Sequence, residues 1–493
     1  MDNERDAPGD ARAAATVPIR LRTSLAQSSV PYVPYMVPVT WRRAQLSTLV
    51  NKLLAVADGA ADRKPVPFDF IVNGELLRCG LDEFLAQHDL SREVALELEY
   101  IRSTLPPSFR DAAKEDDYIA SIDATRDGVY LTASFDGHAR VHRADALRED
   151  PLVYAPPHGD EPVSLTCARW LSDAAVLTGS LTGALSAWRI PDAAPGAQVP
   201  VLQTLSLRHH TAAITTLDVA RDASAAASAV SASWDGTVAL WHVPEVPGSS
   251  GAAPAHDSAD DAAPKRRRVR DSAKRASGSG SAEPAPLVPT TVLTHVPPSV
   301  GAAAARALGA APVPGTNART YAAHDPRAER VYSAAWDGSV KAWDLAAGGV
   351  LAGQKSSDKV PLCLDALRAA SSGPQLVTGH MDHSLALYDF RDTVSSALAI
   401  AHAHAAPVGA VCASATTNHQ FVSGAYDGRL KMWDVRSPKQ PLFALAQPSA
   451  TTGDGDVGRT KILALAWTRD GSIVAGGEDC RLSVYEAAEG GGG

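Results

Sequence analysis

The stretch Ser231-Ala-Ser-Trp-Asp-Gly-Thr-Val-Ala-Leu-Trp241 decides the fold of this chain. Small residues lead into an Asp-Gly pair, and the residues after it alternate in polarity up to a tryptophan six positions beyond the aspartate. Glycine accepts the positive φ that a tight turn requires, and aspartate caps its own backbone. The stretch therefore predicts two antiparallel strands joined by a tight turn, a β-hairpin.

The same spacing occurs seven times along the chain. In each copy an anchor residue lies six positions before a ring: Asp136 before His142, Thr182 before Trp188, Asp235 before Trp241, Asp337 before Trp343, Asp382 before Tyr388, Asp427 before Trp433 and Asp479 before Tyr485. Successive anchors are 46, 53, 102, 45, 45 and 52 residues apart, against about 40–45 for WD40 blades. A lone hairpin cannot bury its faces, so we predict a mainly β fold, a seven-bladed propeller over residues 118–487.

Two copies end in the dipeptide typical of WD40 proteins, Trp343-Asp344 and Trp433-Asp434, and on these residues the chain resembles that family. WD40 blades hold a buried hydrogen-bond network of His, Ser, Asp and Trp. The third copy offers four residues for such a network: His210, Ser233, Asp235 and Trp241. We interpret this set as structural rather than catalytic.

Three copies depart from the pattern. The first has His142 in place of tryptophan, the second has Thr182 in place of aspartate, and the fifth has His383 in place of glycine. The bounds of blades one, two and five are therefore not set by the repeat alone.

The interval between Asp235 and Asp337 is about twice the length of one blade repeat, and we assign the extra residues to 244–290. This segment is rich in Ala, Pro, Ser, Gly and Asp, so it cannot offset its ordering entropy, and we predict a disordered insertion. Between 265 and 275 it has seven basic residues and one acid, a net charge of +6. The basic residues are Lys265, Arg266, Arg267, Arg268, Arg270, Lys274 and Arg275.

This compact basic cluster predicts a nuclear localisation signal that docks in the acidic grooves of an import receptor. Direct contact with RNA phosphates is compatible with that role. A solvated charge run is the plain alternative. We expect a nuclear protein.

Composition excludes several classes of protein. The 46 basic and 55 acidic residues give a net charge of −9, which argues against wholesale nucleic-acid binding. Five scattered cysteines without a Cys-x-x-Cys pair argue against a disulfide framework and favour a reducing compartment. The sequence contains no apolar window of about 18 residues, so no membrane-spanning helix is predicted. Residues 1–15 lack the apolar core of a secretory signal.

Residues 17–102 have a different pattern, which predicts a separate domain. An alternating strand begins at Val17, a second follows at Val33, and Leu46 starts an apolar stripe at helical spacing. Asn73-Gly74 marks a tight turn between two further strands, and a short helix precedes a last alternating strand. This order is that of a ubiquitin-like β-grasp fold. We expect a disordered N-terminus at 1–16, a linker at 103–117 and a flexible tail at 488–493.

A ubiquitin-like module before a WD40 propeller resembles the WD-repeat protein 12 type of ribosome biogenesis factor, with its Notchless-like N-terminal domain. The stretches Pro65–Arg78, Leu90–Tyr100 and Leu105–Phe109 carry the resemblance, which spans nearly the whole chain. Notchless itself has eight repeats and no comparable basic insertion. The resemblance implies a non-enzymatic scaffold of large ribosomal subunit biogenesis, required for large-subunit rRNA maturation. It also implies a nucleolar and nucleoplasmic location on the pre-ribosomal particle.

The resemblance implies partners as well. The propeller binds the block-of-proliferation WD40 protein, pescadillo completes the trimer, and the ATPase midasin engages the ubiquitin-like domain for release from the pre-ribosome. The resemblance implies that Glu93, in the stretch Leu90–Val94, is the acid that binds midasin's integrin-like metal site. Such a contact is chemically reasonable, because a Mg²⁺ with open coordination positions accepts a carboxylate oxygen in trans. Midasin supplies that Mg²⁺, and we expect no metal or cofactor in the chain itself. If the family resemblance is set aside, Glu93 is only one of three acids, Glu93, Glu97 and Glu99, on a polar strand face.

Two other classes of function stay open at this stage. A WD40 substrate receptor of a ubiquitin ligase is the main alternative, and an uncharacterised hydrolase is the weakest. The chain has no P-loop, no Gly-x-Ser-x-Gly elbow and no His-Glu-x-x-His motif. His402 and His404 suggest metal ligands, but we interpret them as isolated loop histidines. The terminal Gly490–Gly493 follows the propeller rather than the ubiquitin-like fold, so it does not indicate a protein modifier.

Overall fold

The computed structural model describes most of the chain outside a few segments. The described residues are 15–23, 29–58, 65–103, 106–149, 151–154, 163–190, 202–221, 227–244, 287–295, 320–325, 329–367, 376–391, 398–447 and 460–487. The chain forms two compact units, residues 1–112 with 361–493 and residues 113–360. Neither helix in the described part of the chain is long and apolar enough to cross a membrane.

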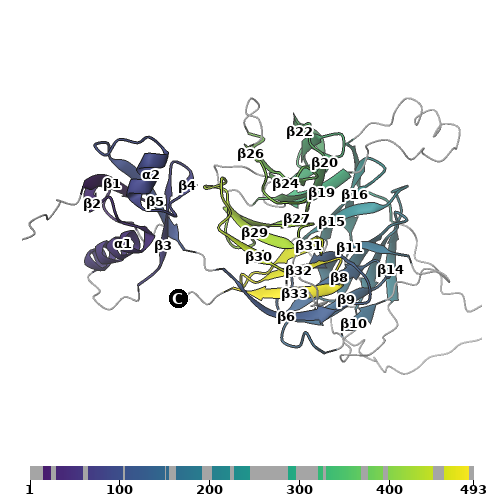
Figure 1. Ribbon diagram of the computed structural model, residues 1–493. Helices are drawn as coiled ribbons and strands as arrows, with labels where there is room; N and C mark the ends of the chain where they lie inside the picture. The colour runs from purple at the N-terminus through teal and green to yellow at the C-terminus, as the bar shows by residue number, and fades with distance from the viewer. Residues whose placement is uncertain are drawn as a thin grey trace, which may run out of the picture. The chain divides into compact units, whose positions relative to one another are not determined.

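The first unit begins with a five-stranded sheet in the order β2-β1-β5-β3-β4, in which β1 and β5 are parallel. Its elements along the chain are β1 (Thr16–Arg22), β2 (Pro34–Pro38), α1 (Arg43–Asp58), β3 (Phe68–Val72), β4 (Glu75–Leu76), α2 (Leu81–Gln87) and β5 (Leu96–Arg102). This is the predicted order of strands and helices, and it forms the expected β-grasp sheet with α1 across one face (Figure 1). We call these elements the N-terminal domain.

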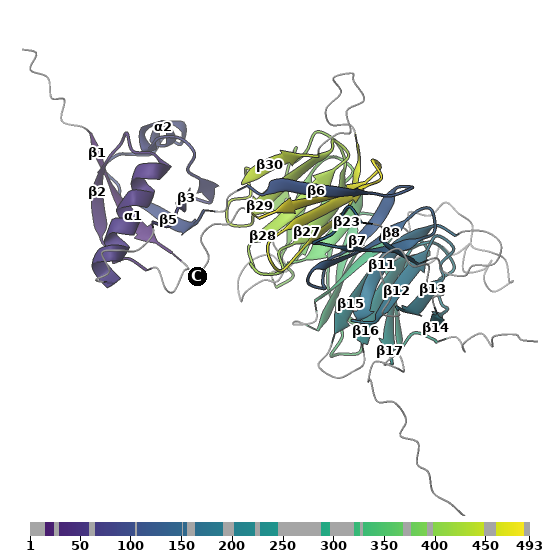
Figure 2. The same ribbon diagram turned by 90° about the horizontal axis from the view of Figure 1, so that it is seen from below.

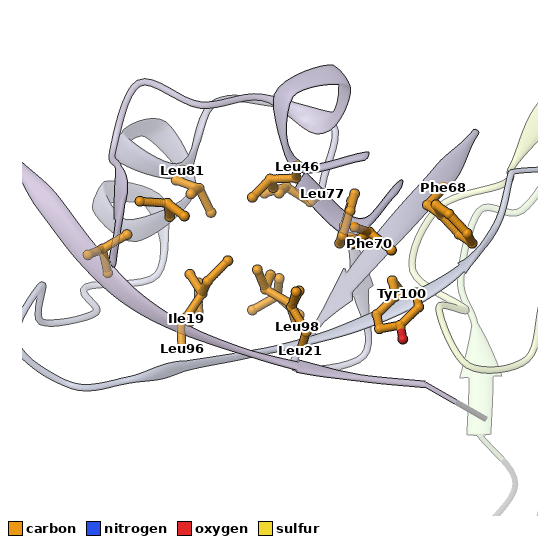
Figure 3. Close-up of a cluster of buried hydrophobic side chains, with 14 of the residues drawn as sticks. Ile19, Leu21, Leu46, Phe68, Phe70, Leu77, Leu81, Leu96, Leu98 and Tyr100 are labelled. Atoms are coloured by element: carbon orange, nitrogen blue, oxygen red, sulfur yellow. The ribbon is translucent and has the colours of Figure 1, made fainter. Parts of the chain in front are cut away.

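The core of the N-terminal domain lies between the sheet and the helices (Figure 3). Alternate residues of β1 point inward, so Ile19 and Leu21 are buried while their neighbours stay more exposed. Leu46 from α1 packs against them in the same buried cluster. At one end the Tyr100 ring meets Phe68 edge to face at 5.6 Å, and its hydroxyl accepts the backbone N–H of Val30 at 3.0 Å. The two packed layers hold the loops at the ends of the sheet in place.

The second unit contains four sheets of four antiparallel strands each, formed in chain order. The first two are β7 (Ile119–Asp123), β8 (Val129–Ser134), β9 (Ala139–Arg143) and β10 (Leu152–Tyr154), then β11 (Leu165–Ser172), β12 (Ala175–Ser180), β13 (Leu185–Arg189) and β14 (Leu202–Leu207). The next two are β15 (Ile214–Arg221), β16 (Ala227–Ser233), β17 (Thr237–Val243) and β18 (Thr291–Thr294), then β19 (Thr320–Asp325), β20 (Arg330–Ala335), β21 (Ser339–Asp344) and β22 (Val350–Ser356). The innermost strands β7, β11 and β15 of successive sheets lie side by side (Figure 2).

The first unit contains three further four-stranded sheets. The first two are β23 (Pro361–Ala366), β24 (Leu376–His380), β25 (Leu385–Tyr388) and β26 (Leu398–Ile400), then β27 (Val408–Ala413), β28 (Gln420–Ala425), β29 (Arg429–Asp434) and β30 (Phe443–Ala446). The last is β31 (Ile462–Trp467), β32 (Ile473–Gly477), β33 (Arg481–Glu486) and β6 (Ser108–Lys114). Seven four-stranded sheets in the described part of the chain confirm the predicted fold class, a WD40 propeller after a β-grasp domain.

The predicted linker 103–117 needs correction, because it contains strand β6. This strand is the outer edge of the last sheet, although it precedes the first sheet in the chain. Only Ala113 of its seven residues is buried, so β6 has no alternating apolar pattern that a sequence reader can recognise. Its place is set by the free edge of β33, which only the folded chain provides.

The turns of the hairpins explain both the pattern and its exceptions. Gly236 and Gly338 adopt φ of 81° and 80°, and a Cβ at Gly338 would collide with the backbone oxygen of Ser357. His383 and Cys480 take the glycine position in the fifth and seventh copies and adopt φ of 72° and 55°. The turn keeps its geometry there at the cost of a strained residue.

The predicted insertion 244–290 falls mostly outside the described residues, and the whole basic cluster at 265–275 lies there. The described chain resumes at Leu287, whose backbone N–H donates to the oxygen of Ser206 at 2.8 Å. The N–H of Thr290 donates to the oxygen of Leu240 at 2.8 Å. These bonds carry residues 287–290 directly into β18. The predicted N-terminus 1–16 and tail 488–493 also lie outside, apart from residues 15 and 16.

Phe70→Ala is expected to destabilise the N-terminal domain by about 3–5 kcal/mol, because it leaves a cavity in a fully buried cluster. Hydrogen exchange of the β1, β3 and β5 amides in the full chain measures this loss. Val56→Ala is the control, since that side chain on α1 is 82% exposed and should change stability by less than about 0.5 kcal/mol. Unchanged protection in Phe70→Ala would contradict this core.

Candidate partner-binding site and blade networks

Glu93 lies in the short loop between α2 and β5, and this loop is anchored at its start. The N–H of Leu90 donates to the oxygen of Leu85 at 3.0 Å, and the Leu90 side chain packs against the domain core. The N–H of Glu93 donates to the hydroxyl of Ser91 at 3.2 Å. Within three residues the chain enters β5 at Leu96, which is buried. The loop therefore presents Glu93 from a fixed base.

The side chain of Glu93 is exposed, and among the described residues its carboxylate has no hydrogen-bond or ion-pair partner. The nearby Glu97 differs, because its carboxylate accepts the Tyr32 hydroxyl at 2.6 Å. A free carboxylate on an anchored loop is able to offer an oxygen to a partner's metal ion or basic group. The described residues contain no cluster of His, Cys, Asp and Glu able to hold a metal by themselves.

The third sheet contains the hydrogen-bond network that the sequence predicts, with one correction. The ring of His210 lies 3.2 Å from Asp235 and 2.8 Å from Ser231, and the indole N–H of Trp241 donates to the same Ser231 hydroxyl at 2.8 Å. The network serine is therefore Ser231 and not Ser233. Ser233 lies two residues closer to the turn, where its hydroxyl donates to the backbone oxygen of Ala212 at 2.9 Å.

The same indole contact occurs in four sheets, always with the hydroxyl ten residues earlier. The pairs are Trp188 with Thr178 at 2.8 Å, Trp241 with Ser231 at 2.8 Å, Trp343 with Ser333 at 2.7 Å and Trp433 with Ser423 at 2.8 Å. This spacing of ten was present in the sequence as a signal that distinguishes Ser231 from Ser233. The indole is a donor only, so each hydroxyl accepts from it and keeps its own proton for another partner.

Two further histidines belong to such networks. His295 lies between the hydroxyls of Ser333 at 2.5 Å and Ser339 at 2.8 Å and is fully buried. His404 lies 2.7 Å from Ser423 and 3.5 Å from Asp427. His404, which sequence reasoning treated as a loop histidine, is therefore the counterpart of His210 in the sixth sheet.

Burial and hydrogen bonding shift the pKa values of these networks. Burial raises the pKa of Asp235, but the bonds from His210, Thr237 and Thr211 outweigh it and lower the pKa to about 2. Burial and the nearby charge of Lys341 lower the pKa of His295 to about 4. At neutral pH Asp235 is therefore ionised and His295 is neutral.

The first sheet lacks the tryptophan and uses a different cluster, which sequence reasoning missed. The carboxylate of Glu115 accepts the Thr132 hydroxyl at 2.5 Å and lies 2.9 Å from the ring of His142. Arg140 lies 3.5 Å from the other Glu115 oxygen and pairs with Asp136 at 2.5 Å. Glu115 is buried although it lies in the segment 103–117. His142, which departs from the repeat, thus pairs through one ring nitrogen with a residue outside the repeat.

Burial makes the thiols of Cys167 and Cys363 poor nucleophiles. All five are free thiols. Burial raises the pKa of Cys167 to about 11 and raises that of Cys363 further. A thiol with a raised pKa is a poor nucleophile at neutral pH.

Two family profiles match the chain. The profile described as "NLE (NUC135) domain" matches residues 17–85, which cover most of the N-terminal domain. The profile described as "WD domain, G-beta repeat" matches residues 201–242 and 396–434, which contain the hairpins of the third and sixth sheets. Both matches fall on elements already described.

Several relatives match the chain over nearly its whole length. The chain is 31% identical over 95% of its length to "Ribosome biogenesis protein YTM1" of Laccaria bicolor, covering 94% of that protein. It is 29% identical to "Ribosome biogenesis protein WDR12 homolog" of Chlamydomonas reinhardtii, over 94% of this chain and 95% of that one. It is 28% identical to "Ribosome biogenesis protein ytm1" of Schizosaccharomyces pombe, over 97% and 98% of the two chains.

Ser231→Ala is expected to cost about 1–3 kcal/mol of unfolding free energy, because it leaves the Trp241 indole N–H and the His210 ring without their shared partner. Ser233→Ala removes bonds to backbone groups near the turn and should cost less. Chemical unfolding followed by tryptophan fluorescence compares the two variants. A larger loss for Ser233→Ala would argue against Ser231 as the network residue.

We also expect the free energy of unfolding to decrease as the pH is lowered, because His295 is held neutral in the folded chain. The folded pKa of about 4 lies below the unfolded value of 6.5, so between these pH values only the unfolded chain binds the proton. The contribution is complete above pH 6.5 and is lost as pH falls toward 4, by up to about 3 kcal/mol. Thermal unfolding of the wild type and His295→Gln across this range should show a shallower pH slope for the variant. Parallel slopes would refute the assignment.

Proposed function

This chain belongs to the YTM1/WDR12 family of ribosome biogenesis proteins, and we propose that it acts in that process as a non-enzymatic scaffold of the large ribosomal subunit. The observation that carries the proposal is the likeness of the whole chain, N-terminal domain and WD40 sheets together, to relatives that are named for ribosome biogenesis. The scaffold is required for maturation of the large-subunit rRNAs.

The lack of catalysis is supported by how the polar side chains are used. The buried His210 and Asp235 bond to each other and to the hairpin, and His404 does the same in another sheet. Groups that elsewhere serve as acids and bases are here committed to holding the sheets together. The thiols of Cys167 and Cys363, whose pKa values burial raises, are protonated at neutral pH. The chain acts through its surfaces.

The partners follow from the family resemblance. The propeller binds the WD40 propeller of the block-of-proliferation protein, and pescadillo completes a trimer on the pre-ribosomal particle. The basic cluster at 265–275 binds an import receptor, so the protein works in the nucleus, in nucleolus and nucleoplasm. The same cluster is suited to contact rRNA phosphates.

The N-terminal domain is the part of the chain that midasin binds in order to release the scaffold from the pre-ribosome. Glu93 offers its carboxylate to the Mg²⁺ in the integrin-like domain of midasin, and ATP-driven movement of midasin pulls the scaffold off the pre-ribosome. The anchored loop and the free carboxylate support this role, because an oxygen that bonds to nothing else is available to a metal ion. The metal comes with the partner, and the chain needs no cofactor of its own.

Affinity purification of the tagged full-length protein is expected to yield pescadillo, the block-of-proliferation protein and large-subunit precursors together. Depletion of the protein should cause large-subunit rRNA precursors to accumulate. Recovery of ubiquitin-ligase subunits without pescadillo would favour a substrate receptor instead and would overturn the proposal.

Glu93→Gln is expected to weaken binding to the midasin domain in Mg²⁺ by at least about 100-fold, since a neutral amide is a much poorer Mg²⁺ ligand than a carboxylate. Pull-down and titration with the purified domain measure this. Asp82→Asn on α2 is the matched control, because it also removes an exposed carboxylate from the same domain. Wild-type affinity in Glu93→Gln would contradict the role of this residue.

A further inference from the structure

We infer that a pocket between the third sheet (β15–β18) and the fourth sheet (β19–β22) binds basic side chains of the chain's own segment 265–275. The pocket has a volume of about 360 Å³, near the lower end of the range for ligand sites. Basic residues bound there are not available to an import receptor, and this consequence rests on the proposed function. The contact with the pocket does not depend on it.

Two histidines face each other across the pocket. Leu240 of β17 packs in one hydrophobic cluster with Val331 of the fourth sheet. His242 lies two residues after Leu240 on the same strand, so its side chain points toward the fourth sheet as well. From the other side, His324 of β19 is the register partner of Val331 and shares its face toward the third sheet. Both histidines line the pocket.

Glu329 adds a carboxylate to the same pocket. Its side chain is exposed and has no hydrogen-bond or ion-pair partner in the part of the chain that the structure describes. Its backbone has a φ of 47°, in the left-handed region that favours glycine. Its backbone oxygen accepts the N–H of Leu345 at 2.9 Å, which holds the turn in place. The fold therefore keeps an acid in a strained position, and such positions cluster at binding sites.

The chemistry of the lining complements a cationic head on an alkyl stem. Glu329 is the only acid among the described lining residues, and none of them is Lys or Arg. Neutral imidazoles and the hydroxyls of Ser228 and Thr291 are able to accept hydrogen bonds, which Lys and Arg only donate. Leu240 and Leu345 provide apolar surface for the alkyl stem. An anionic ligand would meet the Glu329 carboxylate without a basic side chain to offset it.

The occupant follows from where the described chain stops and resumes. It stops at Pro244, two residues after His242, and it resumes at Leu287, three residues before Thr290. His242 and Thr290 both line the pocket. The segment that contains the basic cluster is therefore joined to the fold on both sides within a few residues of the pocket.

The tether makes a modest pocket sufficient. Twelve positions separate Arg275 from Leu287, and a chain of that length spans up to about 40 Å. The basic cluster is therefore within reach of the pocket. A ligand tethered in this way is present at an effective concentration near the millimolar range, so even weak contacts to Glu329 are occupied.

Zero-length crosslinking of the full-length protein tests the contact. A water-soluble carbodiimide joins a carboxylate to an amine where the two touch, and it takes up the water released as the amide forms. Mass spectrometry is expected to find amides from Glu329 to Lys265 or Lys274, with a yield that falls at high salt. Asp127 is the matched control, because it is an exposed acid in the corresponding turn of the first sheet, between β7 and β8. It should form no such amide.

His242→Leu separates the pocket from simple charge attraction. It removes an acceptor but leaves the reacting carboxylate, and it is expected to lower the yield at Glu329 several-fold. Equal yields at Glu329 and Asp127, or an unchanged yield in His242→Leu, overturn the pocket. Mixing isotope-labelled and unlabelled protein shows whether the amide joins residues of one chain. Amides between chains overturn the chain's own segment as the occupant.

Binding to a purified import receptor tests the consequence. Glu329→Gln is expected to bind the receptor several-fold more tightly than the wild type, because the pocket then competes less for the basic cluster. Asp127→Asn should bind like the wild type. Equal affinity of the wild type and Glu329→Gln overturns the competition. A receptor that binds none of these proteins, while the crosslink to Glu329 forms, refutes the proposed import role of the cluster and supports the pocket contact alone.

Discussion

Four of the propeller sheets share one recurring bond, the indole N–H of a tryptophan donating to a hydroxyl ten residues earlier. In each of the four sheets that have it, the tryptophan pairs across the hairpin with the residue twelve positions earlier, as Trp241 does with Ala229. The hydroxyl is two positions closer to the turn on the same face, so it is the diagonal neighbour. A buried indole without an acceptor is costly, so in these four sheets the bond stabilises the hairpin register, which the other three sheets share.

The rest of each network follows from that register. Because Ser231 accepts from Trp241, its own proton is free for His210, and the ring of His210 then faces Asp235 at the turn. Asp235 is held ionised by these donors, which explains why its pKa falls to about 2 despite burial. The polar side chains of this network thus bond to one another and stabilise the hairpin.

In the N-terminal domain, the carboxylate of Glu93 lies exposed on the loop before β5. A single sheet packed on α1 and α2 gives the loop before β5 a fixed base, since Leu90 and Leu96 on either side of it contact the core. An exposed carboxylate on an anchored loop is able to bond to a basic group or a metal ion of another protein.

The sequence by itself determined the repeat, the hairpin turns and the order of elements in the N-terminal domain, because turn chemistry and apolar periodicity are local properties. It also located Glu93 through a family motif. Only the tertiary structure decided that β6 closes the last sheet and that Glu115 pairs with His142. Each of these depends on which polar group or strand edge a distant segment leaves unsatisfied. That is a property of the folded chain and not of any local pattern.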